Sequence, residues 1–232
     1  MPGSAQHVAV PPVVGDFEAL LARARRLAGA GSRHLLGMAG GPGAGKSTLA
    51  GAIVDALGDA ARLVPMDGFH LANAELVRLG RRERKGAIDT FDAAGYVALL
   101  RRLHDPAEQL VYAPEFRREI EEPIAGAVAV PRDVPLVVTE GNYLLATDGH
   151  WGEVRALLDE AWYIDLSEET RLARLTQRHL DYGMSWEAAR AMSLGSDQRN
   201  AELVAATRQH ADVLVRLDAL RFPQHLDHNQ RW

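Results

Sequence analysis

The sequence predicts an α/β protein in which helices cover both faces of a central parallel sheet. Short, continuous apolar segments alternate with amphipathic segments along the chain, a pattern typical of strands that are buried on both faces. Two of the apolar segments end in a carboxylate, Asp67 and Glu140, and a glycine-rich turn follows a third. With 232 residues, 47% of them hydrophobic, the chain is expected to form one domain over residues 1–232.

The elements of the first half are placed by the period of their apolar residues. Residues 16–28 carry apolar side chains at helical spacing, whereas the segment HLLGMAG is continuously apolar, as a buried strand is. The turn GPGAGKST separates that strand from the next helix, and a basic segment over residues 71–90 is expected to be irregular or partly helical. The elements expected in this half are helix 16–28, strand 34–40, helix 49–58, strand 62–66 and helix 92–104.

The second half opens with an irregular excursion over residues 111–130 that is expected to include a hairpin. Ser167 is a suitable cap for a helix, because two glutamates then lie in the first turn, where the helix dipole favours them. A further helix over residues 186–210 is expected to break near Gly195. The other elements expected here are strand 135–145, helix 153–158, strand 161–166, helix 168–180 and strand 212–217.

Composition excludes several classes of site and partner. A formal net charge of −5 argues against general nucleic-acid binding, so any anionic ligand must be met by local positive charge. The chain has no cysteine, which excludes disulfides and thiolate sites. The N-terminal segment lacks the basic region of a signal peptide, and no apolar stretch approaches the length of a membrane span, so we expect a cytoplasmic protein without a membrane partner.

Lysine is rare in this chain. Of the 26 basic residues only Lys46 and Lys85 are lysines, and all the others are arginines. Codon bias with two chance survivors is one explanation. The other is that these two positions need a compact ammonium on a flexible stem, which a planar guanidinium cannot replace.

The segment GGPGAGKST carries the strongest functional signal. Gly40–Ser47 matches the phosphate-binding pattern G-x-x-x-x-G-K-[ST], and it lies between a predicted strand and a predicted helix, as that pattern requires. Glycines leave backbone N–H groups free to surround a phosphate, the lysine supplies a point charge to the β- and γ-phosphates, and the serine ligates Mg²⁺. The residues expected to bind nucleotide are Gly41, Gly43, Ala44, Gly45, Lys46, Ser47 and Thr48.

A phosphate-binding loop alone does not separate a kinase from other nucleotide-binding proteins. GTPases need an N-K-x-D segment to read guanine, and neither lysine of this chain lies in one. Two classes remain open: a kinase that acts on a small molecule, and a regulatory or assembly protein that binds nucleotide without phosphorylating a small molecule. The carboxylate at the end of the second strand discriminates between them, because only a kinase needs it for catalysis.

Several segments together resemble a known superfamily. MDGFH and EGNYLL, after the second and third predicted strands, resemble the P-loop kinases that include uridine kinase, phosphoribulokinase and bacterial type I pantothenate kinase. RKGAIDTFD, YAPEFRR and a late RH…G…N pattern are similar to the subgroup of fructose transport system kinases, also described as nucleoside/nucleotide kinase-like. The resemblance extends from about Leu35 to Leu217. It implies a three-layer P-loop nucleoside triphosphate hydrolase fold with a helical lid over residues 168–210, and it favours a homodimer.

The same resemblance implies a phosphotransferase that moves the γ-phosphoryl group of Mg-ATP to a hydroxyl of a sugar, a nucleoside or a pantothenate-like metabolite. Asp67 matches the carboxylate that accepts the hydroxyl proton, although a plain turn residue is the alternative. Glu140 matches the acid that would hold Mg²⁺ together with Ser47. Both carboxylates follow strands whose carboxyl ends share one edge of a parallel sheet. Gly68 is expected to let the backbone turn so that Asp67 points into the cleft.

The family resemblance, together with the place of each residue in the chain, implies which side chains contact the acceptor. The residues expected to contact the acceptor are His70, Lys85, Tyr112 and Arg118. A structural histidine is the alternative for His70, and a solvated basic loop is the alternative for Lys85. The chain departs from the subgroup at two positions. Ile88 stands where proline is usual, and Arg117 replaces an acidic residue, which would suit an anionic acceptor unless Arg117 points to solvent.

Three arginines, Arg171, Arg174 and Arg178, lie on one face of the helix predicted over residues 168–180. In an acidic protein, such a face suits a lid that closes over the triphosphate, with Arg174 as a catalytic residue beside Asp67 and Lys46. A surface helix whose arginines pair with neighbouring glutamates is the alternative. Asn200 matches a subgroup asparagine to which we assign no role.

Overall fold

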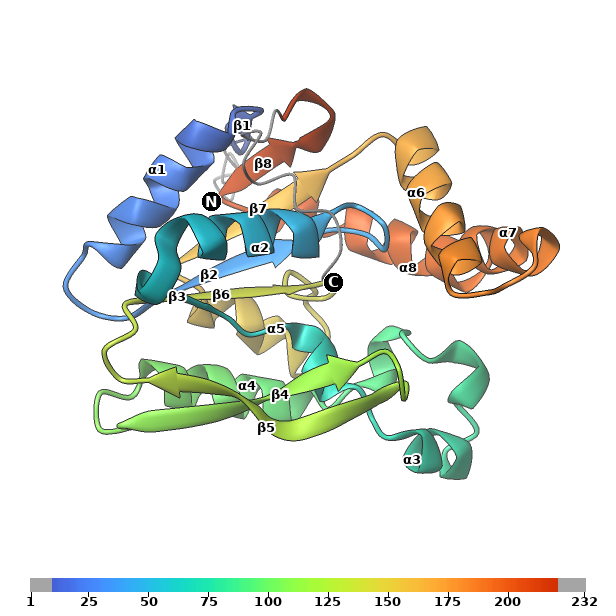
Figure 1. Cartoon of the computed structure of the whole chain (residues 1–232), viewed down its shortest axis with the longest axis horizontal. Helices are drawn as coiled ribbons and strands as arrows, with labels where there is room; N and C mark the ends of the chain where they lie inside the picture. The colour runs from blue at the N-terminus through green and yellow to red at the C-terminus, as the bar shows by residue number, and fades with distance from the viewer. Residues whose placement is uncertain (1–9, 221–232) are drawn as a thin grey trace, which may run out of the picture.

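The computed structural model describes residues 10–220, so residues 1–9 of the N-terminal segment considered above, and residues 221–232, lie outside it. The core is a six-stranded parallel sheet, which confirms the predicted fold class. Its strands are β1 (Val13–Val14), β2 (His34–Ala39), β3 (Ala61–Leu63), β6 (Leu136–Gly141), β7 (Glu160–Asp165) and β8 (Val213–Arg216). They lie in the order β1-β8-β7-β2-β6-β3 (Figure 1).

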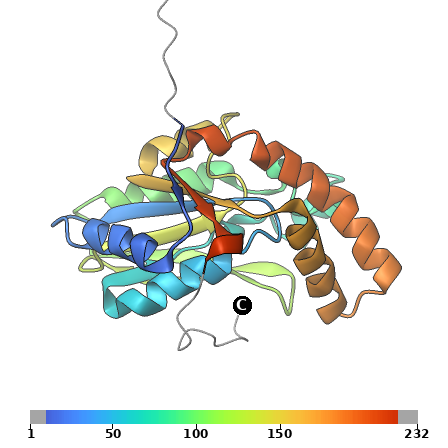
Figure 2. The ribbon, with the colours of Figure 1, turned by 90° about the horizontal axis from the view of Figure 1, so that it is seen from above.

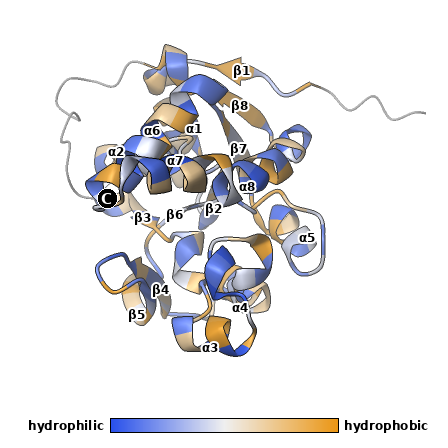
Figure 3. Cartoon of the chain, turned by 90° about the vertical axis from the view of Figure 1, so that its right-hand side faces the viewer, coloured by the Kyte–Doolittle hydropathy of each residue, from blue (hydrophilic) through white to orange (hydrophobic). Residues whose placement is uncertain are grey.

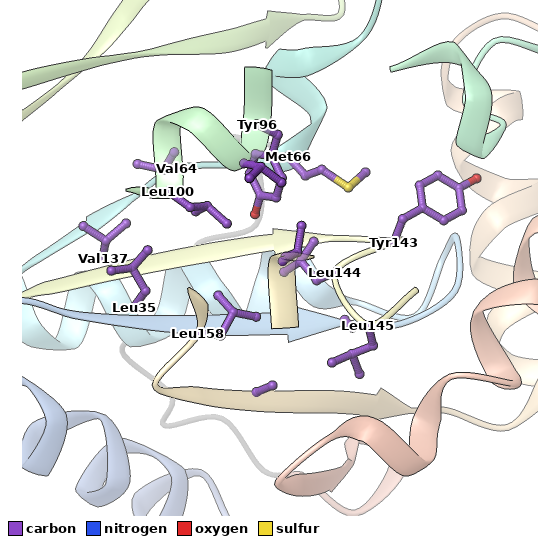
Figure 4. Close-up of a cluster of buried hydrophobic side chains, with 14 of the residues drawn as sticks. Leu35, Val64, Met66, Tyr96, Leu100, Val137, Tyr143, Leu144, Leu145 and Leu158 are labelled. Carbon is purple, nitrogen blue, oxygen red and sulfur yellow. The ribbon is translucent and has the colours of Figure 1, made fainter. Parts of the chain in front are cut away.

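Helices cover both faces of this sheet and make it the middle of three layers. On one face, α1 (Phe17–Ala28) and α2 (Lys46–Leu57) pack on Leu36 and Val138. On the other, α4 (Ala93–His104) and α5 (Trp151–Val154) join the second buried cluster. Figure 4 shows Leu35 and Val137 from adjacent strands in this second cluster, near Tyr96 and Leu100 of α4. Successive residues of one strand therefore serve opposite layers, because strand side chains alternate between faces.

The excursion before β6 is a hairpin, as expected. β4 (Leu110–Arg117) and β5 (Glu122–Pro131) form a separate two-stranded antiparallel sheet. Val111, Ala113 and Val130 are buried in the same cluster as α4. The hairpin lies on the α4 side of the main sheet, and its turn approaches the short helix α3 (Asn73–Arg78) (Figure 1).

Three helices form the predicted lid segment. They are α6 (Glu168–Asp181), α7 (Trp186–Leu194) and α8 (Ser196–Ala205), and they extend past the carboxyl edge of the sheet (Figure 2). The hydroxyl of Ser167 accepts a hydrogen bond from the Thr170 N–H, which confirms the predicted cap. The predicted break at Gly195 is also confirmed, because α7 ends before it and α8 begins after it. Helices α6 and α8 are in contact, with His179 Nε2 2.9 Å from Asp197 Oδ2.

Some boundaries differ from those predicted. The strand expected over residues 62–66 ends at Leu63, because the chain turns into a 3₁₀ helix over Met66–Phe69. The helix expected over residues 186–210 ends at Ala205. β1 was not predicted, since a two-residue strand is too short to show a period. No helix in the described part of the chain has the length and apolarity to cross a membrane.

Candidate active site

A cavity of about 1190 Å³ opens at the carboxyl edge of the sheet, the edge that Figure 3 faces. Its walls come from the glycine-rich loop, the end of β3, the β4–β5 turn, the end of β6, helix α6 and the segment after β8. Of the residues predicted for the site, those that line the cavity are Gly43, Gly45, Lys46, Ser47, Thr48, Asp67, Arg118, Glu140, Arg174 and Arg178. The remaining predicted residues lie behind or beside it.

The glycine-rich loop has the backbone that a phosphate cradle needs. Gly43 and Gly45 have φ angles of +80° and +89°, in the left-handed region that glycine adopts most readily. A Cβ on Gly45 would also lie 2.5 Å from Leu217 Cδ2. The loop leads directly into α2, whose N-terminal N–H groups add partial positive charge at the cavity. Gly41 and Ala44 belong to the loop but are not among the residues that line the cavity.

Lys46 is buried at the base of this loop. Its Nζ donates hydrogen bonds to the Gly41 carbonyl at 3.1 Å and to Asn142 Oδ1 at 2.8 Å. Burial lowers the pKa of Lys46, and the carboxylates of Glu140 and Asp67 oppose that shift. Sequence reasoning missed Asn142, although it follows Glu140 by two positions, where an oxygen can reach the lysine.

Ser47 and Glu140 meet at the same end of the cavity. The Ser47 hydroxyl donates to Glu140 Oε1 at 2.9 Å, which links the start of α2 to the end of β6. Burial raises the pKa of Glu140, while the charge of Lys46 opposes this shift. In the described residues no group of three or more acidic or histidine side chains could hold a metal. A hydroxyl and one carboxylate nevertheless fit Mg²⁺, which takes few protein ligands and completes its shell with phosphate oxygens and water.

Asp67 lies in the 3₁₀ helix after β3 and lines the cavity opposite the glycine-rich loop. Arg118 Nη2 is 3.9 Å from Asp67 Oδ2. Gly68 follows Asp67 with a φ that is not positive, and a Cβ there would collide with the carbonyl oxygen of Pro114. The glycine is needed so that the 3₁₀ helix and β4 can approach closely.

His70 lies behind Asp67 rather than in the cavity wall. Its Nδ1 is 2.8 Å from the Asp67 carbonyl oxygen, and its ring lies 4.0 Å from that of Phe91 and 4.7 Å from that of Phe116. Burial lowers the pKa of His70. The structure therefore brings His70 to the backbone of Asp67, and contact of His70 with an acceptor stays a prediction.

The three lid arginines separate into two environments. Arg174 and Arg178 line the cavity, whereas Arg171 is buried, with Nη1 donating to the Pro42 carbonyl at 3.3 Å and Nη2 donating to Gln198. Burial lowers the pKa of Arg178, and the neighbouring charge of Arg118 acts in the same direction. Two of the three lid arginines thus line the cavity, together with Arg117 and Arg118.

Two residues predicted for acceptor binding do not reach the cavity. Lys85 Nζ donates to Asn73 Oδ1 at 2.7 Å and to the Glu121 carbonyl, while the Tyr112 side chain stands on the hairpin, 55% exposed. Arg117 lines the cavity, but its Nε pairs with Glu115 Oε2 at 2.9 Å, which offsets the charge that favoured an anionic acceptor. The loop around Ile88, where proline was expected, is held by a hydrogen bond from Trp151 Nε1 at 3.2 Å.

Comparisons with known proteins add independent findings. No family model matches the chain. A protein of Schizosaccharomyces pombe named as a candidate uridine kinase, C227.14, is 34% identical over 182 residues, which cover 75% of this chain and 77% of that protein. The ATP-dependent kinase-like protein notR' of Aspergillus versicolor is 33% identical over 159 residues, 65% of this chain and 92% of that protein.

A solved structure shows the same architecture. The crystal structure of a candidate fructose transport system kinase from Silicibacter sp. TM1040 has a TM-score of 0.76 and 36% sequence identity to this chain. The match covers 84% of this chain and 98% of that one. The two chains therefore share one fold over most of their length.

Proposed function

This chain belongs to the P-loop ATP-dependent kinases related to uridine kinase, and from that premise we propose that it transfers the γ-phosphoryl group of Mg-ATP to a hydroxyl of a sugar, a nucleoside or a pantothenate-like metabolite. One observation supports this most directly. Asp67 and the glycine-rich loop line the same cavity, at the edge of a parallel sheet where ligands bind.

The hydrogen-bond donors at the glycine-rich loop indicate which end of the cavity would bind the nucleotide. Lys46 and the backbone N–H groups of the loop would hold the phosphates, and Thr48 would contact the α-phosphate. Ser47 and Glu140 would hold Mg²⁺, which supplies charge neutralisation at the phosphate oxygens. Before nucleotide binds, Lys46 Nζ is held by the Gly41 carbonyl and Asn142, so its ammonium is already desolvated and directed into the loop.

Asp67 is the proposed general base. A carboxylate at this position can orient the acceptor hydroxyl and accept its proton as the oxygen attacks phosphorus. Arg174 and Arg178 line the same cavity and would stabilise the negative charge that spreads over the transferring group. Arg118, at the hairpin turn, places a further positive charge beside the base.

A coupled ATPase screen against sugars, nucleosides and pantothenate, repeated with Asp67→Asn, tests this function. We expect one acceptor class to accelerate ATP consumption in the wild type, and Asp67→Asn to lower that turnover by about 10²–10⁴-fold without weakening ATP binding. Asp59→Asn is a matched control, because the Asp59 side chain is fully exposed and lies outside the cavity lining.

The alternative is a regulatory or assembly protein that binds ATP without phosphorylating a small molecule. It gains support if no acceptor raises turnover although ATP binds, and unchanged turnover in Asp67→Asn would contradict the proposed base. A homodimer and a cytoplasmic location stay predictions of the sequence.

A further inference from the structure

We propose that Lys85 and Asn73 are positioning residues that fix the β4–β5 turn, and with it Arg118, beside the proposed base Asp67. This inference rests on the proposed function. It gives Lys85, which does not line the cavity, a role at a distance from the acceptor.

The two residues converge on one backbone carbonyl. Lys85 Nζ and Asn73 Nδ2 both donate to the Glu121 carbonyl oxygen, the latter at 3.0 Å, and Lys85 also donates to Asn73 Oδ1 at 2.7 Å. The Asn73 N–H donates to both carboxylate oxygens of Glu122, at 3.0 and 3.1 Å. We call this group of contacts the turn clamp: Asn73 and Lys85 on one side, Glu121 and Glu122 on the other.

The clamp holds a turn that is strained. Glu121 has a φ of 53°, and in the described part of the chain it is the only residue other than glycine with a positive φ. A glutamate in the left-handed region is strained unless other contacts compensate. The hydrogen bonds to its carbonyl supply that compensation, so the turn keeps its shape because the clamp is closed.

The turn in question carries cavity residues. Residues 118–121 connect β4 to β5, and Arg118 and Glu119 of this turn line the cavity. The ion pair from Arg118 to Asp67 is long, at 3.9 Å, and both side chains are partly exposed, so it is too weak to fix the turn by itself. The position of Arg118 therefore depends on contacts elsewhere on the turn.

The other side of the clamp is firmly anchored. The carbonyl oxygen of Gly86, the residue after Lys85, accepts hydrogen bonds from the Tyr143 hydroxyl at 2.6 Å and from Asn200 Nδ2 at 3.3 Å. Tyr143 follows β6, and Asn200 lies on α8. Asn200, which had no assigned role, thus ties the lid segment to the base of the clamp.

The turn clamp also contacts the aromatic side chains next to Asp67, the proposed base. Lys85 Nζ lies 4.9 Å from the ring centroid of Phe116, and that ring stacks on His70, whose Nδ1 is hydrogen-bonded to the Asp67 carbonyl. One ammonium therefore meets the turn that carries Arg118 and the aromatic pair behind Asp67. A compact, flexible ammonium fits between two oxygens and a ring, which a planar guanidinium does less well.

The test compares Lys85→Met, which keeps the stem, with Arg84→Met on the same loop. Arg84 is a suitable control, because it is exposed and its side chain pairs with Asp89 of its own loop. In hydrogen exchange on the nucleotide-free protein, we expect amides of residues 118–121 to exchange about tenfold faster in Lys85→Met alone, as for loss of one or two net hydrogen bonds. Equal exchange in both variants would overturn the clamp.

Steady-state kinetics with the acceptor identified in the screen test whether Lys85 positions Arg118. Lys85→Met should raise the KM for the acceptor about tenfold while the KM for ATP stays the same. In an Arg118→Met background, it should add no further increase, because the group that it positions is then absent. Equal effects on both KM values, or additive effects with Arg118→Met, would reduce Lys85 to a general structural role. If no acceptor is found, the proposed function fails, and the exchange data still decide on the clamp.

Discussion

At the scale of single residues, the cavity is lined by five cations and four carboxylates, which are Lys46, Arg117, Arg118, Arg174 and Arg178, and Asp67, Glu115, Glu119 and Glu140. The charges of Arg178 and Arg118 lower the pKa of Lys46, and the charge of Arg118 lowers that of Arg178, while Asp67 acts in the opposite direction on both. Cations arranged in this way favour an anion of high charge between them, such as a triphosphate.

Arg174 gives the first prediction at this scale. Arg174→Ala should lower kcat by about 10²–10³-fold while the KM for ATP changes little, because its charge is needed mainly when the transferring group carries charge in the transition state. Steady-state kinetics with varied ATP check this. Arg190→Ala on α7, an exposed arginine stacked on Trp186, is the control and should leave both constants unchanged. A matching rise in KM for ATP would make Arg174 an anchor of the bound nucleotide instead.

His70 gives a pH prediction. Burial lowers the pKa of His70 from an ordinary value of 6.5, so below that pH the unfolded chain binds a proton that the folded protein resists. This group therefore makes the folded protein less stable as pH falls from 6.5 toward the lowered pKa, and it has no effect well above 6.5.

Urea unfolding at pH 7.5 and 5.5 measures this contribution. The loss of stability between these values should be smaller in His70→Gln than in the wild type, since glutamine does not titrate. An identical loss in both proteins would mean that His70 takes up its proton in the folded state as readily as in the unfolded chain.

At the scale of secondary-structure elements, contacts between segments set some element boundaries that the period of apolar residues does not reveal. Periodicity found α1, α4 and α6, and the cap at Ser167, because these depend on local spacing. It placed the end of β3 too late, since the 3₁₀ helix that follows is set by close contact with β4. The family resemblance, not periodicity, predicted that Lys85 and Tyr112 contact the acceptor. Neither lines the cavity, because Lys85 reaches the Glu121 carbonyl and Tyr112 lies exposed on the hairpin.

Gly68 carries the prediction for this scale. Gly68→Ala should cost about 1–3 kcal/mol of stability, because the new methyl group meets the Pro114 carbonyl and pushes the 3₁₀ helix away from β4. Thermal unfolding measures the loss. Since Asp67 is the preceding residue, acceptor turnover should fall as well, whereas ATP affinity should hold. A variant as stable and active as the wild type would show that the 3₁₀ helix and β4 can move apart without loss of stability.

At the scale of the whole molecule, the sheet brings together the ends of strands that are far apart in the sequence. The carboxylates Asp67 and Glu140 and the glycine-rich loop were predictable as one site, because each follows a strand of the same parallel sheet. Asn142, Arg171 and the turn clamp were not, because their partners come from distant segments whose approach only the folded chain defines.

Nucleotide binding should therefore stabilise the whole fold. At 100 times its Kd, a ligand that binds only the folded protein adds about 2.7 kcal/mol, which for a chain of this size raises Tm by about 5–10 °C. Differential scanning fluorimetry with Mg²⁺ and a non-hydrolysable ATP analogue checks this, with Kd measured separately by calorimetry. Lys46→Met should lose most of the shift at the same concentration, and a wild type without any shift would contradict nucleotide binding at the loop.

Because the chain has only two lysines, each of them can be labelled and identified selectively. Apart from the amino terminus, an amine-selective acylating reagent can modify only Lys46, deep in the nucleotide end, and Lys85, in the turn clamp. The two labelled peptides differ in mass, so the glycine-rich loop and the turn clamp can be followed in one sample without any engineered probe. Protection of Lys46 would then report on the proposed nucleotide, and protection of Lys85 would report on the turn clamp.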